Sequence, residues 1–358
     1  MVQRERTHQP AQPLHVTHRV PVALPRQIDM ENQHQHPRAA HNAASTTATS
    51  LEDTLSRLIT AFHILHHQGL LDECGHVSVR NPDDPSTFFT SNVPAILVSS
   101  RRHLSQWNVT DGSPVTDPVG GCTASEPTPD SEHFMDSCIY DMYPGVQSVV
   151  HSQCLSTMVY GLCNSRGSML QATYQGAGFL GDHTPIFDAE HHYSTRLSDP
   201  YPRNLCINNL TLGDRLAQTF TRDQDMEMDE RMGSEVDGAV GLDDNNCPDC
   251  CVVFLRGHGF VTWAVSIEDA VYRAIHVRRN ADIQTNAMAQ RNSTDMEVVY
   301  LSPREARDCK ETINKATPQV WMAWSAHAER SGLYRTERGG GGRSTGAGEE
   351  STASLPCP

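Results

Sequence analysis

The pattern of apolar and polar residues predicts that folding begins near Ser50. Between Thr54 and Leu65, apolar side chains recur at intervals of three and four residues, which is the period of an amphipathic helix. Gly69 follows as a helix stop. Beyond it, short apolar runs separated by turn residues predict strands. These strands cover residues 75–80, 95–99, the run that ends at His151, and 252–255.

Further helices alternate with these strands. A helix is predicted from Ser131, as its N-cap, to about residue 143, where Pro144 and Gly145 stop it. Other helices are predicted at 154–163, at 207–220 with Leu210, Leu212, Leu216 and Phe220 on the inner side, and at 266–284 with Ser266 as N-cap.

Three stretches have no apolar periodicity. Residues 1–50 are rich in His, Gln and Pro and are predicted to be a disordered tail, as is the Gly- and Ser-rich segment 336–358. In 222–249 acidic residues greatly outnumber basic ones, which predicts a mobile acidic insertion. The remaining residues, 51–335, are predicted to form one mixed domain in which helices cover a central, mainly antiparallel sheet.

Composition narrows the classes of partner. The 43 acidic residues against 28 basic ones give a net charge of -15, which argues against nucleic-acid binding. No apolar run is long enough for a membrane span, and the first residues lack the apolar core of a secretion signal. The 11 cysteines are scattered and odd in number, as expected for thiols of a reducing compartment. We therefore expect a cytoplasmic protein with a small-molecule or protein partner.

Two predicted strands deliver a histidine at their ends. His151 closes the run Val149-Val150-His151, and His258 follows the strand at 252–255 in the segment Arg256-Gly257-His258-Gly259. Together with Glu132 upstream, they would make a half-open site for a divalent metal with a carboxylate beside it. Gln153 stands two residues after His151, where a further imidazole ligand would be expected.

The ordered set of these segments resembles the class II aldolase/adducin family over residues 52–300. The resemblance rests on Gly75-His76-Val77-Ser78-Val79-Arg80, Ser131-Glu132-His133, Pro144 to His151, Tyr174-Gln175-Gly176-Ala177-Gly178, and Arg256-Gly257-His258-Gly259. It implies a three-layer α/β/α domain and a divalent metal, usually zinc, that stabilises an enolate.

The resemblance also assigns the metal positions, which are held by three imidazoles in the family's aldolases. They fall here on His151, Gln153 and His258. An amide oxygen is a harder ligand than an imidazole, so Gln153 shifts the preference from zinc toward Mn, Mg or Fe. The missing imidazole could instead come from His183, His191 or His192.

Two further residues match catalytic positions of the family. Glu132 matches the acid/base carboxylate, although a glutamate in a first helical turn would also be explained by the helix dipole. Tyr174 matches a tyrosine that reaches a neighbouring subunit's site, and the alternative is a core aromatic residue. The first interpretation of Tyr174 implies a closed homo-oligomer, expected to be a tetramer.

The phosphate-binding segments of the sugar-phosphate aldolases are altered in this chain. Gly75-His76 replaces a Gly-Asn pair, Asn92-Val93 replaces a Thr-Gly turn, and Asp130-Ser131 replaces a pair of serines. An aspartate repels phosphate, and loss of a glycine removes a backbone nest for anions. We therefore expect Gly75, His76 and Ser131 to contact a substrate without phosphate.

Two functions remain open from the sequence. The first is a metal-dependent lyase that acts through an enolate on a non-phosphorylated carbonyl compound, by retro-aldol cleavage or decarboxylation. The second is a non-catalytic, adducin-like assembly domain whose metal site has degenerated, which Gln153 favours. Neither the pair Cys247 and Cys250 nor the segment Gly176-Ala177-Gly178 is expected to carry function, because each lacks the sequence context of a zinc site or a nucleotide site.

Overall fold

The computed structural model describes residues 50–72, 74–124, 126, 131–162, 169–182, 184–193, 202–221, 246–291 and 297–335. The chain divides into two units, 1–47 and 48–358, and all described residues lie in the second. The predicted tails 1–50, except Ser50, and 336–358 lie outside the described residues, as does most of the predicted acidic insertion. None of the described helices combines the length and the apolar character needed to cross a membrane.

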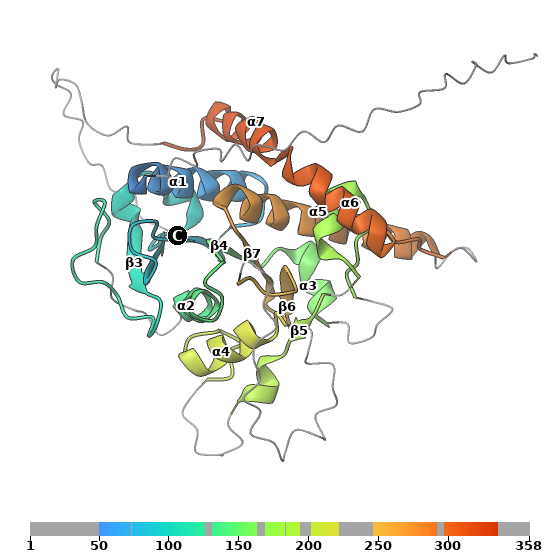
Figure 1. The fold of residues 1–358 in the computed structure, drawn as a ribbon, viewed down its shortest axis with the longest axis horizontal. Helices are drawn as coiled ribbons and strands as arrows, with labels where there is room; N and C mark the ends of the chain where they lie inside the picture. The colour runs from blue at the N-terminus through green and yellow to red at the C-terminus, as the bar shows by residue number, and fades with distance from the viewer. Residues whose placement is uncertain are drawn as a thin grey trace, which may run out of the picture. The chain divides into compact units, whose positions relative to one another are not determined.

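A single seven-stranded sheet forms the middle layer (Figure 1). Its strand order is β3-β2-β1-β4-β7-β6-β5, and every neighbouring pair is antiparallel except β5 and β6. The prediction of a mainly antiparallel sheet is confirmed. The strands are β1 (His76–Arg80), β2 (Thr87–Ser91), β3 (Leu104–Asn108), β4 (Ser148–Ser152), β5 (Ile186–Phe187), β6 (Val252–Leu255) and β7 (Gly259–Ala264).

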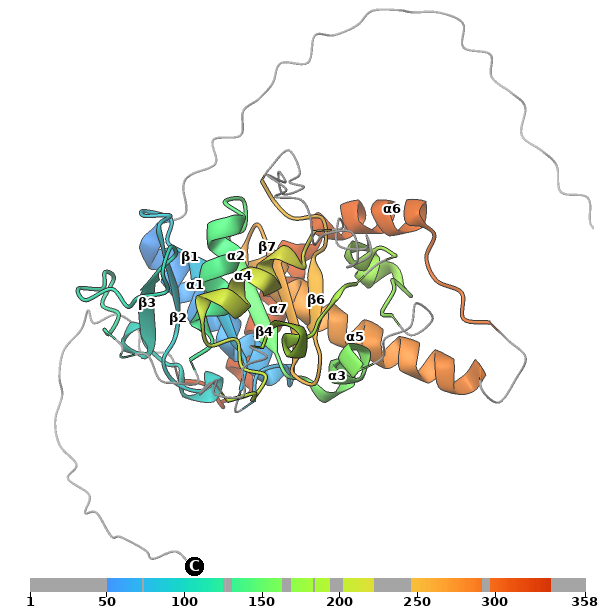
Figure 2. The ribbon, with the colours of Figure 1, turned by 90° about the horizontal axis from the view of Figure 1, so that it is seen from below.

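Helices cover both faces of this sheet, as the two views show (Figures 1 and 2). One face carries α1 and α5, with α7 packed against both, and the opposite face carries α2 and α4. The three-layer prediction is therefore confirmed. The helices are α1 (Leu51–His67), α2 (His133–Met142), α3 (Leu155–Leu162), α4 (Leu210–Gln218), α5 (Ile267–Arg291), α6 (Pro303–Asn314) and α7 (Thr317–Arg330).

The central strands are buried on both faces because helices lie above and below them. Every residue of β4, β6 and β7 is buried. This explains why β6 reads as a continuous apolar run, Val-Val-Phe-Leu, rather than as an alternation. His151 has no exposed surface, because β4 lies centrally between β1 and β7.

Several predicted helix ends are confirmed. Gly69 follows α1 with φ 67°, and the amide of Leu70 reaches back to the carbonyl of Leu65. The side chain of Ser266 accepts from the amide of Asp269 at the start of α5. The helix predicted at 154–163 is α3.

Three sequence predictions are wrong. Residues 95–99 are not a strand, because Pro94 is followed by a single turn of 3-10 helix, Ala95–Leu97, whose Ile96 is 44% exposed. Leu210 is not on the inner side of its helix, since it begins α4 and is exposed. Ser131 is not an N-cap. Glu132 holds that position without a side-chain cap bond, because its carboxylate is directed at histidines instead.

Candidate metal centre

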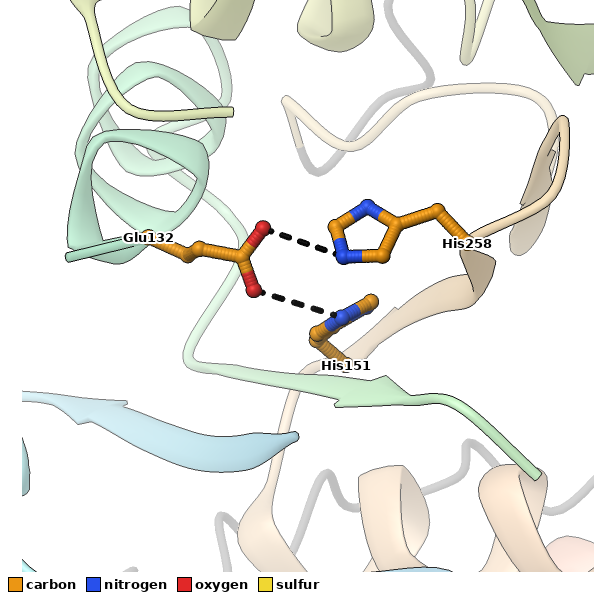
Figure 3. A group of neighbouring side chains, drawn as sticks. All are labelled: Glu132, His151 and His258. Atoms are coloured by element: carbon orange, nitrogen blue, oxygen red, sulfur yellow. Dashed lines mark ion pairs between the residues drawn. The ribbon is translucent and has the colours of Figure 1, made fainter. Parts of the chain in front are cut away.

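Three side chains from separate elements converge at one end of β4 (Figure 3). Glu132 precedes α2, His151 lies on β4, and His258 lies in the turn between β6 and β7. One carboxylate oxygen of Glu132 is 3.6 Å from Nε2 of His151, and the other is 3.2 Å from Nε2 of His258. One donor atom from each residue lies within 4.8 Å of the others. The strand-end histidines and the upstream carboxylate are thus brought together as the sequence predicted.

Two glycines allow the backbone of the neighbouring strands to lie close to the end of β4. Gly75 has φ +86° and Gly259 has φ +95°, conformations that L side chains rarely adopt. A Cβ atom on Gly75 would overlap the carbonyl oxygen of His151, and one on Gly259 would overlap that of Ser152. Gly75 therefore has a structural role here, and its predicted contact with substrate remains a prediction.

The turn that carries His258 is fixed by an ion pair. Nε of Arg256 lies 2.6 Å from Oδ2 of Asp188, which follows β5. The turn is also closed by the amide of His258, which donates to the carbonyl of Leu255. These contacts hold the imidazole of His258 next to that of His151, with ring centroids 5.0 Å apart.

The surroundings of His151 leave one ring nitrogen available as a ligand. Nδ1 lies 3.1 Å from the carbonyl oxygen of Phe260, and because a carbonyl only accepts, Nδ1 carries the proton. Nε2 therefore has its lone pair directed toward the carboxylate of Glu132. It is buried and has no hydrogen-bond partner among the described residues. A backbone carbonyl in this position is the usual second partner of a metal-binding imidazole.

Both imidazoles are neutral at physiological pH. Burial, aided by the neighbouring His76, lowers the pKa of His151 to about 3. Burial and the adjacent His151 lower the pKa of His258 to about 4, although the charge of Glu132 opposes this. Neutral imidazole is the form that binds metal. The two neutral imidazoles, one of them with a buried and unpartnered Nε2, and the carboxylate together form a donor set that fits a divalent cation.

Gln153 lies at the same centre. Its side-chain amide nitrogen is 2.9 Å from Nε2 of His258. Rotating this amide by half a turn would exchange its nitrogen and oxygen and place the oxygen near Nε2. Neither His191 nor His192 joins the donor group among the described residues, and His192 stacks on Phe187 instead. The third candidate for a replacement imidazole, His183, lies outside the described residues.

His76 borders the centre, and behind it lies a residue that sequence analysis missed. His76 pairs with His151 across β1 and β4, and its Nε2 lies 2.7 Å from Oδ2 of the fully buried Asp136. Burial would lower the pKa of His76, but the charge of Asp136 and a hydrogen bond to it reverse this and raise the pKa. The signal in the sequence was the spacing of Glu132 and Asp136, which are four residues apart and so share one face of a helix.

The remaining predicted residues do not meet at the centre within one chain. Tyr174 begins a 3-10 helix, Gln175–Leu180, and its phenol is bonded to Nδ1 of His276 on α5. Burial raises the pKa of Tyr174 to about 12. Ser131 is half-buried next to Glu132, and its predicted contact with substrate remains a prediction.

Comparison with known proteins gives consistent results. The family model described as "Class II Aldolase and Adducin N-terminal domain" matches residues 56–285. The decarboxylase tropJ of Talaromyces stipitatus is 33% identical over 283 residues, which cover 77% of this chain and 94% of that protein.

Solved structures share the fold at low sequence identity. An aldolase II superfamily protein from Pseudomonas syringae has a TM-score of 0.54 at 17% identity, covering 79% of this chain and 95% of its own. L-fuculose 1-phosphate aldolase from Glaciozyma antarctica PI12 has a TM-score of 0.51 at 16% identity, covering 80% and 93%. At such identities these two similarities bear on the fold alone.

Proposed function

The chain belongs to the class II aldolase and adducin family, and we propose that it is a divalent-metal-dependent lyase acting on a carbonyl substrate that carries no phosphate. The observation that carries the proposal is the convergence of Glu132, His151 and His258, with the Nε2 of His151 buried and unpartnered. The 33% identity to a decarboxylase supports a reaction that breaks a carbon–carbon bond.

In this proposal Nε2 of His151 and Nε2 of His258 would hold the metal, and an oxygen of Glu132 or Gln153 would complete the set. When bound, a divalent cation polarises the substrate carbonyl and stabilises the enolate oxygen. Zinc is the metal expected from the family. The oxygen donors of Glu132 and Gln153 also suit Mn, Mg or Fe.

Glu132 is proposed to move the proton in this reaction. Its side chain is 13% exposed, and the backbone amide of Ile207 donates to Oε1 at 3.3 Å, which limits the rotation of the carboxylate. From this position it would take a proton from the carbon next to the carbonyl, or return one to it. Retro-aldol cleavage and decarboxylation both place an electron pair on that carbon, so the same residue would serve either reaction.

Metal analysis combined with proton exchange tests the proposal. We expect the purified protein to bind Zn or Mn at micromolar levels, and His151→Ala and His258→Ala to empty the site. Glu132→Gln should retain metal through the two imidazoles but slow exchange of the α-proton of hydroxyketones or keto acids in deuterated buffer by about a hundred- to ten-thousand-fold. Absence of metal binding, together with exchange that is indifferent to Glu132→Gln, would contradict it.

A second function has one observation in its favour. The amide of Gln153 occupies hydrogen-bonding distance of Nε2 of His258, the atom that a metal would need. A domain that has lost its metal could use this contact to hold the turn and could serve in assembly, as in an adducin-like domain. Metal analysis separates the two, because the assembly domain binds no divalent metal at micromolar levels.

Three wider predictions accompany the proposed lyase. We expect a small-molecule carbonyl substrate because the family's enzymes act on such compounds. A homotetramer and a cytoplasmic location are expected from the resemblance and from the composition of the chain.

A further inference from the structure

A second pair of acid and imidazole lies beside the first. Asp136 follows Glu132 by one turn of α2, and it faces His76 on β1 as Glu132 faces His151 on β4. Nε2 of His76 lies 2.7 Å from Oδ2 of Asp136. The sequence predicted a contact of His76 with the substrate, and the proposed function assigns no role to Asp136.

Asp136 is fully buried, so its stability as a carboxylate depends on the polar groups that contact it. A buried carboxylate is strongly unfavourable unless donors satisfy it. Ser78, two residues along β1 from His76, donates its hydroxyl to Oδ1 at 2.9 Å, and the phenol of Tyr140 lies 2.9 Å from the same hydroxyl. The two oxygens of Asp136 are therefore engaged by Ser78 and His76.

These contacts fix the ring of His76. A carboxylate only accepts, so Nε2 of His76 carries a proton and faces inward. The other ring nitrogen, Nδ1, takes no part in this ion pair. The side chain of His76 is 15% exposed whereas that of Asp136 is 0% exposed, so the pair has a buried end and an open end.

The open end lies at the candidate metal centre. His76 is directly opposite His151 in the ladder between β1 and β4, and their ring centroids are 5.6 Å apart. The imidazole of His76 thus borders the candidate metal centre. The pair is placed to contact the group next to the substrate carbonyl.

We propose that His76 binds an oxygen substituent, a hydroxyl or a carboxylate, on the carbon next to the substrate carbonyl, and that Asp136 is the positioning residue that holds the His76 ring. This inference rests on the proposed function. It gives the substrate class as a 2-hydroxycarbonyl or 3-oxo acid compound. A single imidazole suits one such oxygen group, whereas a phosphate is usually held by several donors or a backbone nest.

Ligand binding to the full-length, Mn²⁺-loaded protein tests the proposal, with malonate as the carboxylate probe and dihydroxyacetone as the hydroxyl probe. Calorimetry should show that His76→Asn, His76→Gln and Asp136→Asn weaken binding of at least one probe by on the order of tenfold, the contribution of one hydrogen bond to a charged group. The probe that loses affinity identifies the oxygen group. Metal stoichiometry should not change.

Ser148→Ala is the matched control. Ser148 is fully buried, and its hydroxyl donates to the carbonyl of Ser78 between the same two strands. This variant therefore loses a buried hydrogen bond without altering the ring of His76. It should lose thermal stability but bind both probes as the parent protein does.

Nitrogen NMR of the metal-free protein gives a second readout. The His76 signal, assigned by its loss in His76→Asn, should report a proton on Nε2, and Asp136→Asn should change that pattern. Unchanged affinity for both probes in all His76 and Asp136 variants would overturn the proposal, as would an Nε2 without a proton. If His151→Ala loses the metal but the His76 variants bind both probes as the parent protein does, this inference alone is refuted. Absence of metal binding would refute the proposed function.

Discussion

The amide nitrogen of Gln153 lies 2.9 Å from Nε2 of His258, the same atom that faces Oε1 of Glu132 at 3.2 Å. One imidazole nitrogen therefore has two polar neighbours that compete for it. An amide is a weaker ligand for zinc than the imidazole that the family's aldolases have in this position. The metal affinity of this chain should accordingly be lower than that of a site with three imidazoles.

Replacing Gln153 with histidine should reverse this deficit. We expect Gln153→His to raise the affinity for zinc by about tenfold or more, since even residues behind the ligands change metal affinity by about ten- to a hundredfold. Competition with a chromogenic chelator measures the change. Gln147→His, which adds an imidazole to the partly exposed residue before β4, is the control and should leave the affinity unaltered. An affinity that stays the same or falls in Gln153→His would contradict the assignment of Gln153 to the centre.

The two histidines could be predicted from the sequence, whereas the burial of Asp136 could not. His151 and His258 each follow a short run of apolar residues, and an imidazole at the end of a buried strand stands out against such a run. Asp136 lies inside a helix, where a single aspartate normally faces solvent. Its burial depends on the contact between α2 and β1, which the local pattern does not specify.

Strands near the edge of the sheet were also difficult to predict from the local sequence. The segment 95–99 has the apolar composition of a strand, but it pairs with none of the described strands and forms a 3-10 turn at Ala95–Leu97. In contrast, β3 has the polar sequence Leu-Ser-Gln-Trp-Asn and was not predicted, yet it pairs with β2 along its full length. Strand formation here is decided by the partner rather than by the composition of the segment.

The glycines on either side of β4 should be required for the metal centre. Gly75→Ala and Gly259→Ala each place a Cβ against the backbone of β4 and add the strain of a positive φ. Because this backbone carries His151, we expect both variants to lose metal and to be destabilised by about 1–3 kcal/mol. Urea unfolding and metal analysis measure the two effects.

Gly69→Ala is the control that separates the backbone strain of a positive φ from the steric overlap of an added Cβ. Gly69 has φ +67°, but the nearest atom to an added Cβ is the flexible end of Arg278, at 3.6 Å. This variant carries the conformational penalty of about 1 kcal/mol alone and should keep its metal. Equal metal loss in Gly69→Ala and Gly259→Ala would show that the effect is general instability.

Tyr174 is expected to act between subunits if it has the role that its position in the family implies. Within one chain its phenol is bonded to His276, so Tyr174→Phe should cost only about 1 kcal/mol of stability, the usual net contribution of one hydrogen bond. Turnover should fall while the oligomer persists. Light scattering and α-proton exchange on the same sample measure both, and a monomer at micromolar concentration would exclude the shared site.

The stability of the metal-free protein should fall as the solution is acidified below about pH 6.5, the pKa of an ordinary histidine. The folded protein holds His151 with a pKa of about 3 and His258 with a pKa of about 4. Between these values and about 6.5 the unfolded chain binds protons that the folded chain does not, so protonation favours unfolding as pH decreases. Above this window the two imidazoles are neutral in both states and contribute nothing. The raised pKa of His76 has the opposite sign: its stabilisation is fully present below about pH 6.5 and is lost above this window, as the pH rises through the raised folded pKa.

For His151 alone, the loss should be about 2 kcal/mol at about pH 5, since each unit of difference in pKa corresponds to about 1.4 kcal/mol. Urea unfolding with a chelator present, at about pH 7.5 and about pH 5, measures it. His151→Gln removes the titrating group and retains a polar side chain, so it should be less stable at the higher pH but lose less on acidification than the parent. If the variant and the parent lose stability equally between the two conditions, His151 does not remain neutral in the folded protein, and its assignment as a ready metal ligand fails.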